Sequence, residues 1–326
     1  METMQAVTIE RFGEADELAV QSIPVPQIAA NEVLIRVAYA GVGSWDVGER
    51  QGGYARMFGS SPSFPYVLGS EGVGEVVAVG SAVTRFHPGQ DVMATGFLNP
   101  TGGFYAQYVA VNEQTVAPVP AGYSAIEASV VLGVGITALR GVIDTLGLSR
   151  DQSLCILGAS GGIGHVALQI ANAIGADVCA VASGPDGCSL VQDLGASSVH
   201  DGRAAATVGS LRQQIGGRFD AVLLTAGGEL ADQLCKLTKP GGTIAFPAGV
   251  QPEPVPPEGV TCKPYYGEPT QEITARLIRM IDRHGIKPHV SAVFAADQAA
   301  HAHRQVVEHH LGKIALDIGT LEDTAA

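Results

Sequence analysis

The chain has 326 residues, a formal net charge of −13 and 46 % hydrophobic residues, whereas charged residues make up only 16 %. Globular proteins average about 25 % charged residues, so this composition predicts a large buried fraction and excludes disorder as the main description. At roughly 150 residues per domain, the length predicts two domains. The acidic excess disfavours nucleic-acid binding, because a protein needs a basic face to displace counterions from a duplex.

The N-terminus and the cysteines predict a cytoplasmic protein that does not associate with a membrane. No apolar run approaches the roughly 20 residues that a membrane-spanning helix needs. The opening METMQAVTIERFG carries Glu2 and no continuous apolar core, unlike a secretory signal. The five cysteines are scattered and form no C-x-x-C pair, which is typical of a reduced protein without a disulfide or zinc framework.

The first 120 residues predict a β-rich, barrel-like module. Short Val-rich runs such as NEVLIRVAYAGV and GVGEVVAVG are separated by Gly and Pro, as in antiparallel sheets. From Ser124 onward the apolar spacing becomes helical. Ser124 is the expected N-cap, and Glu127 three residues later completes a capping box.

Strands and helices then alternate strictly, which predicts a parallel sheet covered by helices. The Pro-rich stretch 250–260 is expected to be a connection that leaves this domain. The predicted elements are strands 153–158, 176–182, 219–227 and 242–249 with a short strand near 200, helices 162–175, 186–195, 207–215 and 230–237, and, after the connection, helix 270–285, strand 289–295, helix 297–310 and strand 312–319.

The strongest local pattern is LCILGASGGIGHVALQIANAIGADV, in which a buried strand runs into glycines that open a helix. The fingerprint G-x-G-x-x-G is matched with Ala159 in its first position, followed by Gly161 and Gly164. A side chain at Gly161 would hold the backbone away from a pyrophosphate, and Gly164 lets helix and strand approach. A glycine-rich turn without a ligand is the alternative. The residues expected to cradle a dinucleotide are Gly158, Ala159, Ser160, Gly161, Gly162, Ile163 and Gly164.

The end of the second strand distinguishes NAD from NADP. An NAD site places an acid there, about 20 residues after the glycines, to accept from the ribose 2′-OH. Here the strand ends AVASG without an acid, which leaves room for a 2′-phosphate to which Ser183 could donate. This favours NADPH. NADH stays open, because Ser183 is equally explained as a turn residue, no Arg or Lys follows nearby, and Asp186 would repel a phosphate.

Further cofactor contacts are expected where other strands end, since ligands of open α/β sheets bind at the carboxyl ends of the strands. Their residues are Thr225, Ala226 and Gly227 after one strand, and Phe246 and Ala248 after another.

Several stretches also carry a family resemblance. They are FPYVLGSEGVGEVVAVGSAVTRFHPGQDVMA (64–94), GGFYAQYVAVNEQTVAPVPAGYSAIEAS (102–129), GITALRGV (135–142), the glycine loop (158–178) and FAADQAAHAHRQV with GKIALDI (294–318). In this order they resemble the zinc-free quinone oxidoreductase branch of the medium-chain dehydrogenase/reductase superfamily. The resemblance covers nearly the whole chain. It implies an α/β fold in which a Rossmann doubly wound parallel sheet (124–264) is inserted into a GroES-like β-rich domain (1–123 and 265–326). It also implies NADPH between the domains and a homodimer.

Zinc enzymes of this superfamily bind their catalytic metal through a Cys, a His in a GHE stretch and a later Cys or Asp. The resemblance places Gly43, Ser70 and Gly133 at these positions, and none of them offers a thiolate or an imidazole. We therefore expect no metal. Without a Lewis acid to stabilise an alkoxide, reduction of a quinone or an electron-poor C=C bond is favoured, because the product anion is delocalised.

The resemblance selects substrate-side residues in AGVGSWDVGERQGGY. Tyr54 corresponds to a tyrosine that lines the family's substrate pocket, and its hydroxyl could donate to a quinone oxygen. Asp46 matches an acidic family position, and Ser44 and Trp45 would lie beside the nicotinamide. The alternatives are packing roles for Tyr54 and Trp45, and a helix cap or ion pair for Asp46.

The resemblance also bears on the cofactor side. Thr137 matches a residue near the nicotinamide. The family's 2′-phosphate lysine and a nearby tyrosine correspond to Gly187 and Gly202, and a frequent pocket asparagine corresponds to Gly43. These departures leave the choice of nucleotide and the orientation of the substrate open.

The sequence thus predicts an NADPH-dependent, zinc-independent reductase of a small quinone or α,β-unsaturated carbonyl compound. One alternative is an enoyl reductase that acts on a thioester or a secondary metabolite, with the same fold and hydride chemistry. Another is a structural or regulatory protein that binds NADPH with little turnover.

Overall fold

The computed structural model describes residues 2–59, 62–204, 209 and 218–321. The predicted helix 207–215 falls almost entirely outside these residues. The chain divides into two compact units, which are Met1–Gly133 with Pro269–Arg279 and His289–Ala326, and Val134–Glu268 with Met280–Pro288. The first unit therefore contains both ends of the chain. The unit boundaries after Gly133 and Glu268 lie later in the chain than the expected 123 and 264.

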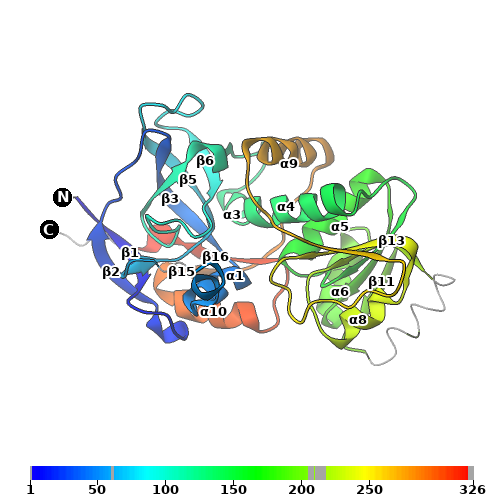
Figure 1. Ribbon diagram of the computed structural model, residues 1–326. Coiled ribbons are helices and arrows are strands. Elements are labelled where there is room, and N and C mark those ends of the chain that lie inside the picture. Colours follow the sequence, from blue (N-terminus) through cyan, green and yellow to red (C-terminus); the bar gives the residue numbers. More distant parts are fainter. Residues whose placement is uncertain (1, 60–61, 205–208, 210–217, 322–326) are drawn as a thin grey trace. The chain divides into compact units, whose positions relative to one another are not determined.

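The first unit is built on β-sheets (Figure 1). A seven-stranded sheet has the order β15-β16-β3-β5-β6-β8, with β7 paired to β3, and a three-stranded sheet has the order β2-β1-β4. Neighbouring strands are antiparallel except for β15 and β16, which run parallel. The strands are β1 (Thr3–Ile9), β2 (Ala19–Pro24), β3 (Glu32–Val42), β4 (Tyr66–Val67), β5 (Glu71–Val79), β6 (Asp91–Thr95), β7 (Tyr108–Asn112), β8 (Val116–Pro118), β15 (Val290–Ala295) and β16 (Lys313–Asp317).

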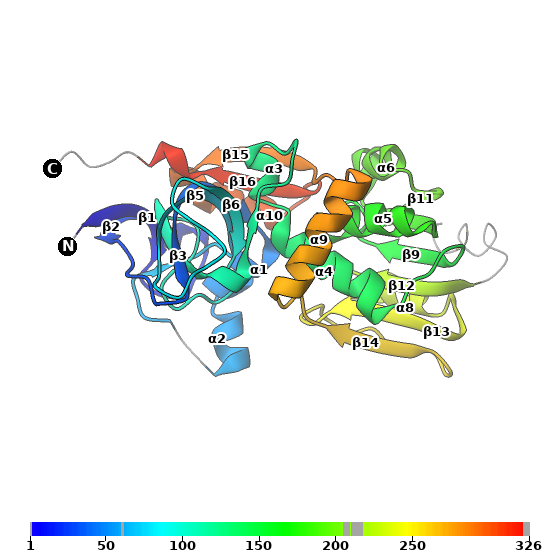
Figure 2. The same cartoon turned by 90° about the horizontal axis from the view of Figure 1, so that it is seen from above.

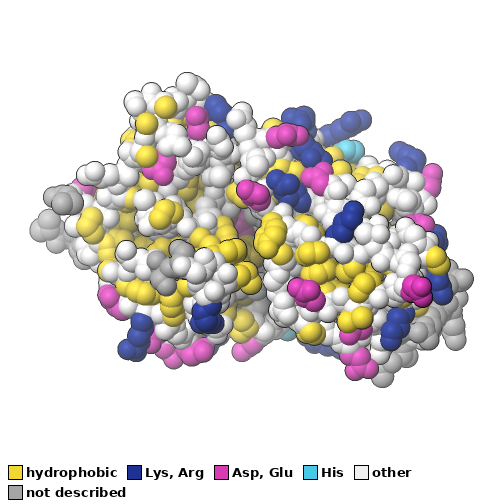
Figure 3. All heavy atoms as spheres, viewed as in Figure 1, with side chains coloured by type: hydrophobic (Ala, Val, Ile, Leu, Met, Phe, Trp, Pro, Cys, Tyr) yellow, Lys and Arg dark blue, Asp and Glu magenta, His cyan; other side chains and the backbone are white. Residues whose placement is uncertain are grey.

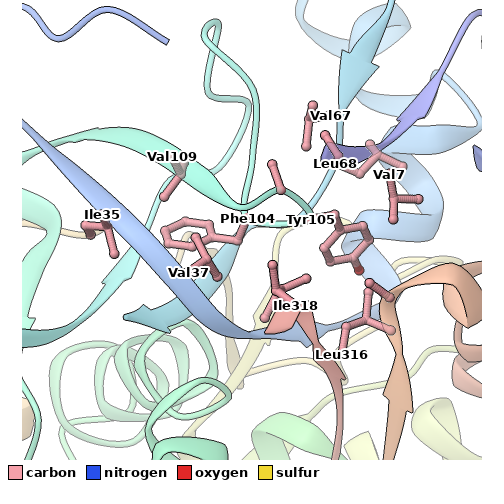
Figure 4. Packing of buried hydrophobic residues seen from close by; sticks show 14 of the residues in the cluster. Val7, Ile35, Val37, Val67, Leu68, Phe104, Tyr105, Val109, Leu316 and Ile318 are labelled. Atoms are coloured by element: carbon pink, nitrogen blue, oxygen red, sulfur yellow. The ribbon is translucent and has the colours of Figure 1, made fainter. Parts of the chain in front are cut away.

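One core joins the two ends of the chain in this unit (Figure 4). Val33, Ile35 and Val37 alternate along β3 and are buried, as the period-two pattern of a half-buried strand requires. Phe104 and Tyr105, fully buried, pack with them in the same cluster, which also contains Leu316 of β16 and Ile318 just beyond it. The C-terminal strand is therefore part of the N-terminal core.

The predicted helix start at Ser124 is present, but the helical stretch after it is divided. Ser124 Oγ accepts the Glu127 N–H at 3.2 Å, and the Ser124 N–H donates to the Glu127 carboxylate at 2.7 Å, which confirms the predicted capping box. The helical stretch after it is split into α3, α4 and a π-helical turn (Arg140–Thr145). The helices are α1 (Ser44–Arg50), α2 (Gly53–Phe58), α3 (Ala125–Ala128), α4 (Leu132–Leu139), α5 (Gly162–Ile174), α6 (Gly184–Asp193), α8 (Glu229–Cys235), α9 (Gln271–His284) and α10 (Ala299–Val307).

The second unit holds a six-stranded parallel sheet in the order β11-β10-β9-β12-β13-β14. This is the strand order of a Rossmann sheet, which reverses between β9 and β12. Figure 2 shows β9, β12, β13 and β14 side by side. The strands are β9 (Ser153–Leu157), β10 (Asp177–Ala182), β11 (Ser198–Asp201), β12 (Phe219–Leu224), β13 (Thr238–Pro247) and β14 (Thr261–Tyr265).

The Pro-rich stretch 250–260 does not leave this unit, contrary to the sequence-based expectation. It leads into β14, which pairs with β13 from Thr243 opposite Thr261 onward. β14 was missed because it is an edge strand that is largely exposed, so it lacks the continuous apolar run of a central parallel strand.

On the face drawn in Figure 3, basic side chains are interspersed with acidic ones, so this face offers no continuous basic surface for a nucleic acid. In the described part of the chain, no helix combines the length and apolar character needed to cross a bilayer.

The close approach of α5 to β9 generates a stability prediction for Gly164→Ala. A Cβ at Gly164 would collide with the Gly158 carbonyl oxygen and lie 2.7 Å from the Ala159 Cα, both of them backbone atoms that cannot move aside. The free energy of unfolding, measured in urea, should fall by about 1–3 kcal/mol. Gly161→Ala is the matched control, because its Cβ would have no neighbour closer than 3.4 Å. Equal stability of the two variants would contradict this account of the packing.

Candidate functional site

The loop between β9 and α5 is held by its own backbone. Gly158 adopts a left-handed conformation with φ 77°, and its N–H and that of Ala159 both donate to the Val181 carbonyl at 3.0 Å. The Gly161 N–H donates back to the Gly158 carbonyl at 3.0 Å. These bonds fix a tight turn at the end of β9. The left-handed position that requires glycine is Gly158, while Ala159 takes the first fingerprint position without strain.

The start of α5 is left open by the protein. In α1 and α3 an acidic side chain at the third helical position caps the first turn, but no side chain caps α5, whose N-cap is Gly161. The first N–H groups of a helix have no partner inside the helix, and together with the helix dipole they attract anions. This arrangement suits the diphosphate of a dinucleotide.

At Gly161 no contact within the described residues requires glycine. Its φ of −83° is accessible to any residue, and an added Cβ would meet only the Gly158 carbonyl oxygen, at 3.4 Å. Neither strain nor packing therefore excludes a side chain here. A ligand that approaches the backbone here would meet no side chain.

Thr225 lies at the point where the strand order reverses. Its Oγ1 donates to the Leu157 carbonyl at 2.9 Å, and its N–H donates to the same oxygen at 3.2 Å. A Cβ at Gly158 would collide with the Thr225 hydroxyl. The carboxyl ends of β9 and β12 thus meet where a doubly wound sheet binds its ligand. Ala226 follows in an exposed position, and Gly227 packs against the backbone of residues 251–252.

The other expected cofactor contacts are reached differently. The Phe246 side chain is 3 % exposed and belongs to the hydrophobic core, so a ligand would meet its backbone rather than its ring. The Ala248 N–H is already donated to the Tyr265 carbonyl at 2.7 Å. Thr137, on α4, packs against Gly267 within the second unit. Their roles stay predictions.

Two serines meet at the end of β10. Ser160 is buried, and its Oγ faces the Ser183 N–H at 3.5 Å and lies next to Gly187. Ser183 is the N-cap residue of α6, but its side chain makes no capping hydrogen bond. The Ser183 hydroxyl therefore has no hydrogen-bond partner among the described residues, whereas the Ser160 hydroxyl lies between the glycine loop and α6.

Arg203 joins these residues, which sequence reasoning missed. β11 pairs with β10 so that Asp201 lies opposite Ala182. The Asp201 carboxylate accepts the N–H groups of Gly184 and Arg203, each at 2.9 Å, and these bonds lower the pKa of Asp201. The exposed Arg203 guanidinium lies 3.2 Å from the place of a Cβ at Gly184, and the Asp186 carboxylate lies 3.0 Å from the same place. The parallel pairing of consecutive strands was the signal, because it sets residues after β11 beside residues after β10.

The substrate-side residues of the first unit surround Asp46, which is fully buried on α1. Its carboxylate accepts the Gly43 N–H at 2.7 Å, the Ser70 hydroxyl at 2.8 Å and the Ser70 N–H at 3.1 Å. Burial raises the pKa of Asp46 to about 6, against the opposing effects of Lys313 and of these hydrogen bonds. Asp46 thus caps α1 and positions Ser70. This geometry favours the helix-cap and ion-pair role over direct proton donation.

Glu49 lies one turn further along α1 and is also buried. It accepts the Tyr66 hydroxyl at 2.8 Å. Burial, followed by the negative charge of Asp46, raises the pKa of Glu49 to about 7, while the Tyr66 hydrogen bond lowers it. Two neighbouring carboxylates therefore titrate near neutral pH, a pattern common at functional sites.

Tyr54 and Ser44 lie nearer the surface. Ser44 is the exposed first residue of α1. The half-buried Tyr54 ring makes an edge-on contact with Phe97, with centroids 4.9 Å apart, and a stacked contact with Phe58 at 6.4 Å. Burial, then the charges of Asp46 and Glu49, raises the pKa of the Tyr54 phenol, so its hydroxyl stays protonated. Because this hydroxyl makes no hydrogen bond to the described residues, it can donate to a ligand.

The residues at the expected zinc-ligand positions do not fit zinc. Gly43 and Gly133 have no side chain, and the Ser70 hydroxyl donates to Asp46. Among the residues the structure describes, no three His, Cys, Asp or Glu side chains form a group that could hold a metal.

The raised pKa of Glu49 predicts how stability depends on pH. The folded chain keeps the Glu49 proton up to about pH 7, whereas the unfolded chain loses it near the ordinary pKa of 4.5. The contribution of Glu49 to the free energy of unfolding therefore falls as pH rises from about 4.5 to 7. Glu49→Gln keeps an acceptor for Tyr66. It should shrink the difference in unfolding free energy between pH 5 and pH 8 by about 2 kcal/mol. Urea titrations at both pH values measure this, with the exposed Glu272→Gln as control. An unchanged difference would refute the assignment.

Comparison with known families assigns both units. Residues 29–121 match the family described as "Alcohol dehydrogenase GroES-like domain", and residues 162–276 match the family described as "Zinc-binding dehydrogenase". The second name describes the family as a whole, since the zinc ligands it implies do not fit the residues of this chain.

Individual relatives cover nearly the whole chain. A "Quinone oxidoreductase" of Mus musculus is 27 % identical over 327 residues, 95 % of this chain and 96 % of that protein. An "Alcohol dehydrogenase" of Rhizobium meliloti (strain 1021) is 30 % identical over 298 residues, 84 % of this chain and 83 % of that protein. A solved NAD-dependent alcohol dehydrogenase superposes with a TM-score of 0.87 at 27 % identity, covering 96 % of this chain and 99 % of that one. The chain therefore belongs to the medium-chain dehydrogenase/reductase superfamily, in its quinone oxidoreductase branch, and is an NAD(P)H-dependent oxidoreductase.

Proposed function

We propose that the chain is a zinc-independent, NADPH-dependent reductase of small quinones or α,β-unsaturated carbonyl compounds, acting as a homodimer. The observation that carries the proposal is the uncapped start of α5, where Gly161 has no internal reason to be glycine. The preference for NADPH is supported by Ser183 and Arg203 at the end of β10, where an NAD site would place an acid. The quinone acceptor is supported by the named activity of the Mus musculus relative.

The residues of the chain divide the work by position. The backbone from Gly158 to Gly164 would hold the diphosphate, and Ser183 with Arg203 would hold the 2′-phosphate. The chemistry that bound NADPH supplies is hydride donation. Tyr54 would donate its phenolic proton to the acceptor oxygen and so stabilise the charge that develops there. Asp46 would act indirectly, by fixing the start of α1 on which Ser44 and Trp45 stand.

A substrate panel tests this proposal. NADPH and NADH are first titrated onto the purified chain, and oxidation of the bound nucleotide is then followed with 1,4-benzoquinone, 9,10-phenanthrenequinone and an enoyl-CoA. Faster turnover of the quinones than of the enoyl-CoA supports the proposal. The reverse order supports the enoyl reductase instead. Binding of nucleotide without oxidation by any acceptor would leave the chain a structural or regulatory nucleotide-binding protein.

Gly161→Ala should separate ligand binding from folding. Its Cβ has room within the protein but would stand where a diphosphate approaches the backbone, so the N–H donors of the first turn of α5 would be held away from the anion. We expect an unchanged Tm and a rise of about tenfold or more in the Kd for NADPH, by calorimetric titration. An unchanged Kd would show that the nucleotide binds elsewhere.

Arg203→Ala should reduce the discrimination between the two nucleotides. Loss of an exposed guanidinium beside the 2′-phosphate should raise KM for NADPH by about tenfold and leave KM for NADH unchanged. Steady-state kinetics with both nucleotides measure the ratio. Lys236→Ala, which removes an exposed charge elsewhere in the unit, is the matched control. Equal changes in the KM values for NADPH and NADH would show that Arg203 does not bind the 2′-phosphate.

Tyr54→Phe tests the proton donor. The variant keeps the ring contacts with Phe58 and Phe97 and removes only the hydroxyl, so kcat with quinones should fall about 10- to 100-fold at constant KM for NADPH. Tyr108→Phe on β7 is the matched control. A kcat equal to that of the parent chain would assign Tyr54 to packing alone.

A further inference from the structure

A buried lysine lies among the carboxylates of the first unit. Lys313 begins β16, and its Nζ is 2.9 Å from Glu71 Oε1, with side chains only 3 % and 1 % exposed. The Trp45 ring faces the same ammonium, with its centroid 4.4 Å away. Neither Nζ nor Oε1 has a hydrogen-bond partner among the described residues, so the contact is a charge pair rather than an aligned hydrogen bond.

The carboxylate oxygens around this lysine accept hydrogen bonds, except Glu71 Oε1, which faces the ammonium. Both oxygens of Asp46 accept hydrogen bonds, one from Gly43 and the other from Ser70. Glu71 Oε2 accepts the Gly133 N–H at 2.8 Å, and Oε1 faces Lys313. A divalent cation at these oxygens would lie beside the Lys313 ammonium, whose positive charge repels it.

The residues at the three positions that correspond to zinc ligands donate hydrogen bonds to these carboxylates. Gly43 and Ser70 donate to Asp46, and Gly133 donates to Glu71. Zinc enzymes need thiolate and imidazole ligands at these positions. This chain instead has N–H and hydroxyl donors there, which bind two carboxylates. A buried cation lies nearby on β16, the strand between β15 and β3. The family name and the local chemistry therefore disagree.

We propose that Lys313 is the fixed cation of this site, whose ammonium balances the charges of Glu71 and Asp46 and closes the site to a divalent metal. Two carboxylates buried without a cation would be strongly unfavourable, and removing one partner of a buried pair leaves an uncompensated charge. Trp45 adds a favourable contact between its ring and the ammonium. The inference holds whichever acceptor the enzyme reduces, so it stands apart from the proposed function.

Other titratable groups face the same cluster and must be separated from it. Asp46 interacts with Glu49 on its own helix and with Tyr105 from the loop before β7. His310, in the segment before β16, faces Lys313, and burial followed by this charge lowers the pKa of His310. The pKa of Glu49 is raised to about 7, and Glu49→Gln removes this titrating group while keeping an acceptor for the Tyr66 hydroxyl.

Trp45 provides a direct measurement, because it is the only tryptophan in the chain. Its fluorescence is titrated from about pH 5 to pH 9 in the Glu49→Gln background. We expect an inflection near 6, absent in Asp46→Asn, shifted upward by about one pH unit or more in Lys313→Met, and close to its original place in Lys313→Arg. The same inflection with and without Lys313 would overturn the proposal, since a purely structural lysine would not move it.

A double variant keeps the test valid if Lys313→Met folds poorly. The single variant should lower Tm by about 5–10 °C at pH 8, whereas Lys313→Met with Glu71→Gln, which removes both charges, should recover at least half of the loss. A double variant no more stable than the single variant would show that the two charges do not balance each other and would overturn the proposal.

Metal binding gives the third readout, independent of turnover. The unsubstituted chain, which retains Lys313, is incubated with Co²⁺ and passed through a desalting column. Its visible spectrum is then examined for d–d absorption. No retained cobalt is expected. One equivalent of bound cobalt that is lost in Ser70→Ala would overturn the proposal. Fluorescence, Tm and cobalt retention are measured without an acceptor. A negative result for Lys313 can therefore be told apart from a lack of reductase activity.

Discussion

The close approach of α5 to the end of β9 is the constraint on which the proposed nucleotide site depends. There is no space for a Cβ between Gly164 and the Gly158 carbonyl, nor between Gly158 and the Thr225 hydroxyl. These contacts set the first turn of α5 over the carboxyl ends of β9 and β12, where the sheet order reverses. A helix start in this place, without a capping side chain, presents N–H groups to whatever anion arrives.

The first unit depends on a different kind of contact, between parts of the chain that are far apart in sequence. β16 pairs with β3 and so carries Lys313 to Glu71 on β5 and to Trp45 on α1. A cation supplied by the C-terminal strand therefore stabilises carboxylates supplied by the N-terminal half. The Lys313 ammonium thus places a positive charge beside Glu71 inside this unit.

Membership in the superfamily and the local chemistry answer different questions. The matched families and relatives identify an NAD(P)H-dependent oxidoreductase, but a shared fold hosts many substrates. Which nucleotide and which acceptor are used depends on individual side chains, and Arg203 and Tyr54 are the ones we propose. These stand on loops and short helices at the edges of the two sheets, where substitution costs the scaffold little.

The sequence alone determined what is local: the Rossmann glycine loop, the capping box at Ser124, and the alternation of strands and helices. Such features need only neighbouring residues, so spacing reveals them. Tertiary structure alone decided that β14 continues the sheet, that Arg203 reaches the end of β10, and that Lys313 neutralises Glu71. Each of these depends on strand pairing between distant segments, and pairing partners leave no mark on the composition of either segment.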